Sequence, residues 1–232
     1  MTNNTIKAVA FDADDTLWVN ENHYRNAENK FAQKMAAFCD NITAINALLE
    51  RERKNLPLLG YGSKPFIISL VECGIELSKG TLTNNQILEL IQIGKDTIGN
   101  KIELYPNVEN VLEQLHPNIP LVLATKGDLK EQESKVKRSG LDKYFCHIEI
   151  MSEKNQESYT KLIDRLGITP DNFVMVGNSF KSDILPVLEL GGHAIYIPSE
   201  IIWAHEVTQE IEHPRLYKAN NIESVPTLLK LK

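Results

Sequence analysis

The stretch KAVAFDADDTLW, residues 7–18, runs from an apolar segment directly into three carboxylates. Residues 8–11 have the composition of a short buried strand, and Asp12, Asp14 and Asp15 follow where that strand should leave its sheet. Carboxylates that crowd together raise one another's pKa values and destabilise a fold. The stretch therefore predicts either acids that turn out into water or acids that surround a cation.

Length and charge limit the classes of protein to consider. The chain has 232 residues and a formal net charge of −6. This is longer than an average domain of about 150 residues, so one domain with an insertion, or two unequal domains, is expected. The chain has no basic run and no interleaving of aromatic and basic residues, which argues against a nucleic-acid partner.

Cysteine usage and hydropathy bear on the cellular compartment. Cys39, Cys73 and Cys146 are isolated and form no CxxC pair, which is typical of reduced thiols rather than of a disulfide scaffold. The N-terminal residues are polar, and no apolar run approaches the roughly 18 residues of a membrane span. We expect a cytoplasmic protein with neither a signal peptide nor a membrane partner.

From Pro106 onward, short apolar runs alternate with helical patterns. The run IPLVLAT (119–125) precedes a helical segment in which Asp128 and Glu131 have capping-box spacing and Gly140 marks the end. The same rhythm recurs in the segments 145–151 and 155–167, 172–178 and 182–192, and 193–198. Such alternation is typical of right-handed βαβ units. With the strand at 8–11, we predict an α/β fold with a doubly wound, Rossmann-like parallel sheet of at least five strands.

Ligands of such sheets bind at the carboxyl ends of the strands, near the point where the strand order reverses. The conspicuous polar residues of this chain follow predicted strands: Asp12, Asp14, Thr125, Lys154, Asn178 and Asp183. The sequence therefore predicts one site at that edge of the sheet.

Residues 20–97 break the strand–helix rhythm. Four mostly amphipathic segments, 23–40, 42–56, 65–74 and 83–98, are separated by turn signals such as GYGSKP and SKGTLT. We predict a helical domain of residues 20–97 inserted into a core of residues 1–19 and 98–232. Within it, LGYGSKPF (59–66) could approach a substrate, with Lys64 meeting an anionic group, although an ordinary interhelical loop is the preferred interpretation.

Four motifs, in order, carry a resemblance to a known family. FDADDTL (11–17) matches the DxDxT signature of the haloacid dehalogenase (HAD) superfamily. Thr125 in LVLATKGD resembles the second motif of that superfamily, Lys154 in SEKNQESY the third, and VGNSFKSDI (176–184) a variant of the fourth, GDxxxxD. The resemblance covers nearly the whole chain, and the helical insertion resembles the family's C1 cap.

The resemblance implies a role for each motif residue. Asp12 would be the nucleophile that forms an aspartyl phosphate and would also bind Mg²⁺. Asp14 would act as general acid and base, while its backbone carbonyl binds the metal. Thr125 would hydrogen-bond a phosphoryl oxygen, and Lys154 would pair with Asp12 and the phosphoryl group. Lys126 is a rival for the phosphate-binding role because it follows Thr125 directly.

The fourth motif departs from the family at one position. Asn178 stands where the family usually has aspartate, so the implied magnesium ligand would be a neutral amide oxygen. Asp183, five residues later, would be the second ligand of this motif. Its position near a predicted helix start leaves a plain helix cap open as the alternative.

These inferences favour a Mg²⁺-dependent phosphatase that acts on a small phosphorylated metabolite. A 2-haloacid dehalogenase, which uses the same aspartate without a metal, is one alternative, but it would have no use for Asp14 as a proton donor. A mutase would pass the phosphoryl group to a hydroxyl instead of water. A non-catalytic binding module would be expected to have lost the acid pair or Lys154, and the chain retains all three.

Overall fold

The structure is a computed structural model, which describes residues 6–201 and 203–230. The chain separates into two compact units. One, the core unit, contains the described residues up to Val19, then Ile102–Lys126, and continues from Gln132 onward. The other, the helical unit, contains Asn20–Lys101 together with Gly127–Glu131. Each unit has its own interior and is described separately.

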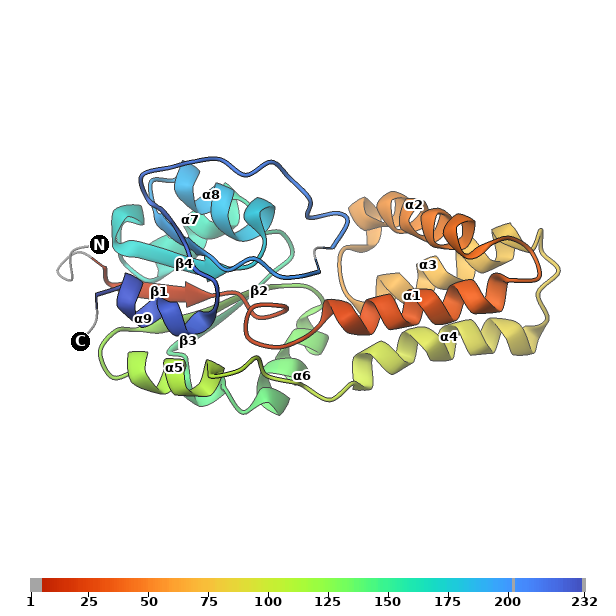
Figure 1. The fold of residues 1–232 in the computed structure, drawn as a ribbon, viewed down its shortest axis with the longest axis horizontal. Coiled ribbons are helices and arrows are strands. Elements are labelled where there is room, and N and C mark those ends of the chain that lie inside the picture. The colour runs from red at the N-terminus through yellow and green to blue at the C-terminus, as the bar shows by residue number, and fades with distance from the viewer. Residues whose placement is uncertain (1–5, 202, 231–232) are drawn as a thin grey trace. The chain divides into compact units, whose positions relative to one another are not determined.

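The core unit is built on a parallel sheet, shown with its labels in Figure 1. The strands are β1 (Ala8–Phe11), β2 (Leu121–Lys126), β3 (His147–Met151), β4 (Phe173–Gly177), β5 (His193–Tyr196) and β6 (Leu216–Lys218). Their order is β3-β2-β1-β4-β5-β6, and all five pairings are parallel. The order reverses beside β1, which lies between β2 and β4. The predicted α/β fold with a doubly wound sheet is confirmed. The strand β6 was not among the strands predicted from the sequence.

Successive side chains of β1 point to opposite faces of the sheet, and all of them are apolar. Both faces of the sheet are therefore covered by helices. Val9 and Phe11 belong to one buried cluster with residues of α5 (Val108–Leu115), α6 (Leu129–Ser139) and α9 (Val225–Leu228). Ala8 and Ala10 belong to another, with residues of α7 (Gln156–Arg165) and α8 (Leu185–Glu189). Figure 1 shows α7 and α8 on one side of the sheet and α5 and α9 on the other. The short helical turns are Asp142–Tyr144, Pro170–Asn172, Phe180–Ile184 and Ile222–Ser224.

The helical unit consists of α1 (Glu21–Met35), α2 (Asn41–Leu59), α3 (Ser63–Leu77) and α4 (Asn84–Gly99). They enclose an apolar core that includes Phe31, Leu48, Leu70 and Leu90. Local signals set the helix ends: Asp40 caps α2, and Thr83 forms a capping box with Gln86 at the start of α4. The four helices coincide with the four amphipathic segments of the sequence.

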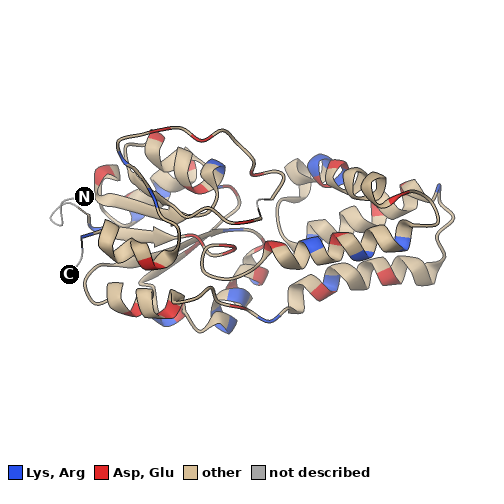
Figure 2. Ribbon diagram, viewed as in Figure 1, with Lys and Arg blue, Asp and Glu red and all other residues tan. Residues whose placement is uncertain are grey.

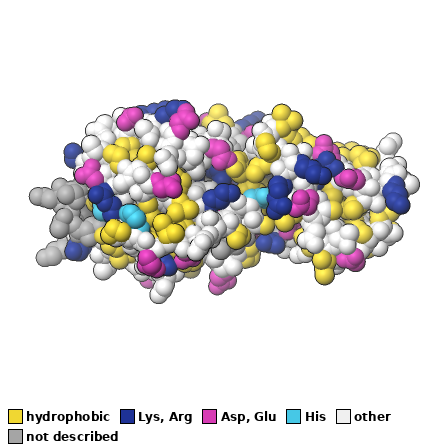
Figure 3. All heavy atoms as spheres, turned by 90° about the horizontal axis from the view of Figure 1, so that it is seen from above, with side chains coloured by type: hydrophobic (Ala, Val, Ile, Leu, Met, Phe, Trp, Pro, Cys, Tyr) yellow, Lys and Arg dark blue, Asp and Glu magenta, His cyan; other side chains and the backbone are white. Residues whose placement is uncertain are grey.

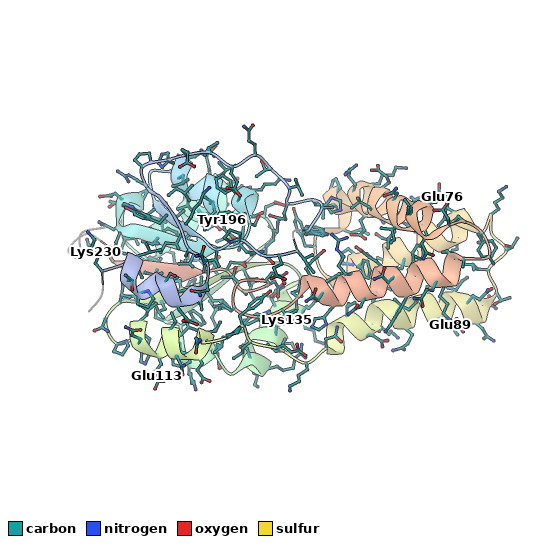
Figure 4. All side chains as sticks on the ribbon, in the orientation of Figure 1. Glu76, Glu89, Glu113, Lys135, Tyr196 and Lys230 are labelled. Carbon is teal, nitrogen blue, oxygen red and sulfur yellow. The ribbon has the colours of Figure 1, made fainter. Side chains whose placement is uncertain are left out.

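Charged side chains of both signs are spread over the helices, as Figures 2 and 3 show. Many form exposed pairs. Lys34 Nζ lies 2.6 Å from Glu89 Oε2, and Arg51 pairs with Glu76; both glutamates are labelled in Figure 4. Such exposed pairs contribute little to stability, typically about 0–1 kcal/mol each. Stability of the helical unit therefore rests on its apolar core.

None of the described helices is both long enough and apolar enough to cross a membrane. The three cysteines are free thiols, as the sequence predicted. Cys73 is buried in the apolar core of the helical unit, where burial, helped by the nearby Glu76, raises the pKa of its thiol to about 12. At this position it serves as an apolar packing residue.

Candidate active site

The loop after β1 places Asp12 at the end of the central strand, with 6% of its surface exposed. The loop turns back at once. Asp15 adopts a left-handed conformation (φ 63°), which aspartate tolerates better than most residues, and its N–H donates to the carbonyl of Trp18 (2.7 Å). The hydroxyl of Thr16, inside this turn, donates to Asp12 Oδ2 (2.9 Å). The threonine of the DxDxT pattern thus orients the first aspartate.

Lys154 joins two of the predicted acids. It lies between β3 and α7, and its Nζ is 2.5 Å from Asp12 Oδ1 and 2.6 Å from Asp183 Oδ1. The lysine side chain is only 2% exposed. Burial alone would lower the pKa of Lys154, but the two carboxylates outweigh burial and raise it well above its ordinary value. Asp12 lies 142 positions from Lys154 in the chain, and Asp183 lies 29 positions from it. The three residues nevertheless form one buried ionic cluster.

The cluster contains more negative than positive charge. Burial, with the nearby carboxylates of Asp183 and Asp14, raises the pKa of Asp12 to about 7, although Lys154 opposes this shift. The pKa of Asp183 is also raised, again mainly by burial. One ammonium group therefore does not fully balance two buried carboxylates, and an added cation would be stabilised here.

Asn178 follows β4 and points its amide at the same place. One end of the amide lies 3.0 Å from Thr16 Oγ1, 3.2 Å from Asp12 Oδ2 and 3.3 Å from the backbone oxygen of Asp14. If that end is the nitrogen, it donates to these oxygens. If it is the oxygen, it accepts from Thr16 and otherwise faces two further oxygens. The second orientation converges three oxygens on one point, as a bound cation requires.

Asp14 is held by donors from two elements. Its carboxylate accepts from Trp18 Nε1 (2.6 Å), from Gln132 Nε2 (2.9 Å) and from Lys135 Nζ (2.9 and 3.1 Å). Gln132 and Lys135, the latter labelled in Figure 4, are one turn apart on α6 and are buried. Burial would raise the pKa of Asp14, but Lys135 and the hydrogen bonds lower it below its usual value.

These three partners of Asp14 were not predicted from the sequence. Trp18 is fully buried in the apolar core, and its indole N–H also donates to Asp14. One feature could have indicated that Gln132 and Lys135 have a buried partner: both lie on the apolar side of α6, beside Val136. A buried polar pair on that side needs a partner.

The second motif lies at the end of β2. Thr125 is 1% exposed, and its hydroxyl makes a long hydrogen bond to Gln132 Oε1 (3.4 Å). Lys126 turns elsewhere: its Nζ contacts Glu206 Oε1 (2.5 Å) and Ser182 Oγ (3.1 Å). Of the two lysines considered for the phosphate, Lys154 therefore contacts Asp12, whereas Lys126 contacts Glu206.

Asp183 lies in a π-helical turn, Phe180–Ile184, and is 1% exposed. The residue that caps this turn is Ser179, whose hydroxyl accepts from the N–H of Ser182 (3.0 Å). Asp183 Oδ2 instead accepts from the N–H of Ser179 (2.9 Å). Gly177 permits this arrangement, because a Cβ there would lie 2.3 Å from Asp183 Oδ2. The contact with the N–H of Ser179 is of the kind that a capping side chain makes, and Asp183 Oδ1 also contacts Lys154, so both interpretations of Asp183 share this geometry.

The segment 59–66 of the helical unit combines a short turn with the start of α3. Lys64 Nζ pairs with Asp128 Oδ2 (2.7 Å), and Ser63 donates both its N–H and its hydroxyl to Glu131 (2.9 Å each). Asp128 also accepts from the N–H of Glu131 (3.0 Å), which confirms half of the predicted capping box. These contacts join the start of α3 to Asp128 and Glu131. They are compatible with the preferred interpretation of segment 59–66 as an ordinary interhelical loop.

Across residues 6–201 and 203–230, no three His, Cys, Asp or Glu side chains are grouped so as to hold a metal ion. The candidate set around Asp12 is of another kind. It combines two carboxylates, Asp12 and Asp183, with the amide of Asn178 and a backbone carbonyl. Such oxygen donors suit hard cations such as Mg²⁺.

Comparison with known proteins agrees with this geometry. A family model for haloacid dehalogenase-like hydrolases matches residues 6–191. The chain is 30% identical over 213 residues to a glyceraldehyde 3-phosphate phosphatase of Methanothermobacter thermautotrophicus, covering 84% of the chain and 87% of that protein. It is also 29% identical over 126 residues to an N-acylneuraminate-9-phosphatase of Rattus norvegicus. That match covers 52% of the chain and 51% of the relative, so the chain spans about half the length of this curated relative.

A solved structure shows the same likeness along nearly the whole chain. A haloacid dehalogenase-like family hydrolase from Xanthomonas campestris superposes with a TM-score of 0.88 at 34% sequence identity, covering 97% of this chain and 91% of that protein. A coverage of 97% means that this likeness extends beyond the matched residues 6–191. On the family match and these relatives, the chain belongs to the haloacid dehalogenase-like hydrolase family.

Proposed function

We propose that this protein is a Mg²⁺-dependent phosphohydrolase that removes phosphate from a small phosphorylated metabolite through an aspartyl phosphate. The observation that supports this best is the buried cluster in which Lys154 contacts both Asp12 and Asp183. A reactive carboxylate, a fixed cation and a second carboxylate are the groups that phosphoryl transfer needs at one point.

The residues present fit a magnesium ion. One atom of the Asn178 amide lies 3.2 Å from Asp12 Oδ2 and 3.3 Å from the backbone oxygen of Asp14. Carboxylate, amide and backbone oxygens are the donors that Mg²⁺ prefers in proteins. Asp12, Asp14, Asn178 and Asp183 would hold the ion. When bound, magnesium supplies positive charge that neutralises the phosphoryl oxygens and favours ionised Asp12.

Asp12 then attacks phosphorus with one carboxylate oxygen, and the bond from phosphorus to the leaving oxygen breaks. The leaving oxygen takes a proton from Asp14. In the second half-reaction Asp14 accepts a proton from water, which attacks phosphorus and releases phosphate and Asp12. The hydroxyl of Thr125 donates a hydrogen bond to a phosphoryl oxygen. The ammonium group of Lys154 balances negative charge in both half-reactions.

The helical unit would act as a cap that selects the substrate, because the motif residues Asp12, Thr125, Lys154 and Asp183 all lie in the core unit. The relatives with the names N-acylneuraminate-9-phosphatase and glyceraldehyde 3-phosphate phosphatase support a phosphorylated sugar acid, triose or similar small metabolite as substrate. We propose a cytoplasmic enzyme that needs neither nucleic acid nor membrane. Lys126 is less well supported than Lys154 as a phosphate ligand because Glu206 already pairs with it.

The decisive test is Asp12→Asn in the purified full chain. An amide does not attack phosphorus, so Mg²⁺-dependent phosphate release from an aryl phosphate should fall to below about a thousandth of wild type. Asp164→Asn on the exposed side of α7 is the matched control and should keep wild-type activity. Beryllofluoride should inhibit the wild type.

Two results would contradict the proposal. One is a folded Asp12→Asn variant that retains more than about a thousandth of the activity, which would exclude the covalent route. The other is chloride release from a 2-haloacid by a protein that releases no phosphate from any phosphorylated metabolite tested. The second result would identify a dehalogenase instead.

A further inference from the structure

Glu206 is a partly buried carboxylate, with 12% of its side chain exposed, that none of the four motifs contains. It lies in the long connection between β5 and β6, drawn in blue in Figure 1. Its Oε1 contacts Lys126 Nζ (2.5 Å) and accepts from Ser182 Oγ (2.8 Å), and its Oε2 accepts from Ser179 Oγ. Both serines belong to the fourth motif. We propose that Glu206 is a positioning residue that braces the π-helical turn carrying Asp183.

The bonds form a continuous path from Glu206 to the ionic cluster. Glu206 holds the hydroxyls of Ser179 and Ser182, and the N–H of Ser182 also donates to Ser179 Oγ (3.0 Å). The N–H of Ser179 donates to Asp183 Oδ2 (2.9 Å), while Asp183 Oδ1 contacts Lys154. Each link fixes an atom that positions the next one. Glu206 thereby acts on Asp183 through the serines rather than by contact.

The turn has reason to need such support. In a π-helix the hydrogen bond runs from residue i+5 to residue i, and this turn is closed by the N–H of Ile184 to the oxygen of Ser179 at 3.3 Å. Helices of this kind are rare, occur mostly as single turns, and are frequent at functional sites. A brace from a distant segment would hold the turn in the geometry that aims Asp183 at Lys154.

Lys126 keeps the brace charged. Burial would raise the pKa of Glu206, but Lys126 and the two serine hydroxyls lower it below its usual range. The bonds to the serines are therefore charge-assisted, which makes them roughly twice as strong as neutral ones. The loop is fastened a second time nearby, because Lys181 Nζ donates to the backbone oxygen of His205 (2.8 Å).

The first test needs no metal and is independent of the proposed function. In Glu206→Gln, the charge-assisted bonds are lost while the size of the side chain is kept. Hydrogen exchange of the metal-free protein, followed on peptides that cover residues 178–185, should become faster by about tenfold, which is the effect of losing about 1.4 kcal/mol of local stability. Glu210→Gln is the matched control: it lies in the same loop but pairs with Lys218 at the surface.

The second test rests on the proposed function, because it measures Mg²⁺. Residues that orient metal ligands typically change metal affinity 10–100-fold when mutated. Calorimetric titration of Mg²⁺ into the full chain should show at least tenfold weaker binding for Glu206→Gln, and a comparable loss for Ser182→Ala, which carries no change of charge. Combining the two substitutions should add little, since both break one path.

The outcomes separate the two ideas. Unchanged exchange of residues 178–185 in Glu206→Gln overturns the brace, whether or not the protein binds magnesium. Faster exchange in a protein that releases no phosphate supports the brace and contradicts the proposed function. Weak Mg²⁺ binding in Glu206→Gln but normal binding in Ser182→Ala overturns the path through the serines, because the effect would then be one of charge alone.

Discussion

At the scale of single residues, the site is defined by a shortage of positive charge. Asp12 and Asp183 share Lys154, while Asp14 has its own partner in Lys135. The two lysines divide the acids into two groups with opposite shifts: the pKa of Asp12 is raised and that of Asp14 is lowered. In the metal-free protein these directions are the reverse of what the proposed roles need, because a nucleophile must be ionised and a general acid protonated; bound Mg²⁺ would favour ionised Asp12.

This charge balance predicts how stability depends on pH. Burial raises the pKa of Asp12 to about 7 in the folded, metal-free protein, against 3.8 for an ordinary aspartate in an unfolded chain. Between these two values the folded state binds more protons than the unfolded state, so the stabilising effect of the protonated acid is present below about pH 4 and is lost as pH rises to 7. Metal-free Asp12→Asn should lack this loss and gain on the order of 1 kcal/mol relative to wild type between pH 5 and pH 8.

The measurement is urea unfolding of both proteins at pH 5 and pH 8 in the presence of a chelator. The difference between wild type and variant matters, since Asp183 and other groups titrate in both. Asp164→Asn should follow the wild-type pH profile. A variant that loses as much stability as the wild type over this range would show that Asp12 is ionised throughout.

The sequence predicted which motif residues meet better than it predicted the residues that hold them in place. Asp12, Lys154 and Asp183 do meet, because strand ends of a parallel sheet converge at one edge. Gln132 and Lys135 were missed, since one glutamine and one lysine on an amphipathic helix are indistinguishable from surface residues until the helix is packed. Whether each motif residue has its implied role stays a prediction for the experiments above.

At the scale of elements, local signals predicted the helices and strands of the repeating part. The capping residues and the glycines that end helices are local, and Gly140 does end α6 in a left-handed conformation (φ 69°). The strand order was not predictable in the same way, because it depends on contacts between segments far apart in sequence. The π-helical turn at Phe180–Ile184 was also missed, since the helical pattern after β4 carries no local signal for i+5 hydrogen bonds.

The junction of β4 and this turn gives a prediction at the same scale. In Gly177→Ala the new Cβ would lie 2.3–2.6 Å from three atoms of the Asp183 side chain, so that side chain must move. Overpacking of this kind costs about 1–3 kcal/mol. We expect that loss of stability together with at least tenfold weaker Mg²⁺ binding.

A second substitution tests the cause. Gly177→Ala should cost much less stability in an Asp183→Gly background, because the atoms that collide are gone. Gly99→Ala at the end of α4, where a Cβ meets nothing within 4 Å, is the control for replacing a glycine. Equal costs of Gly177→Ala in both backgrounds would show that backbone strain, not Asp183, is responsible.

At the scale of the whole molecule, the chain holds separate hydrophobic interiors. The clusters that contain β1 belong to the core unit, whereas the cluster of Phe31, Leu48 and Leu70 belongs to the helical unit. The motif residues Asp12, Thr125, Lys154 and Asp183 all lie in the core unit. Both units have an apolar core, but only the core unit holds the candidate site. A core substitution in the helical unit and a ligand of the core unit should therefore each affect the unit concerned.

This division predicts two assignable transitions in calorimetric unfolding. Leu70 is fully buried, so Leu70→Ala should destabilise the helical unit by about 2–5 kcal/mol and lower one transition. Mg²⁺ binds only the folded core unit if the proposed function is right, so it should raise the other transition with the logarithm of its concentration relative to Kd. Leu88→Ala, on a side chain that is 61% exposed, should move neither. A single transition that both Leu70→Ala and Mg²⁺ shift together would mean that the two interiors unfold as one, and that the helical unit shares the stability of the site.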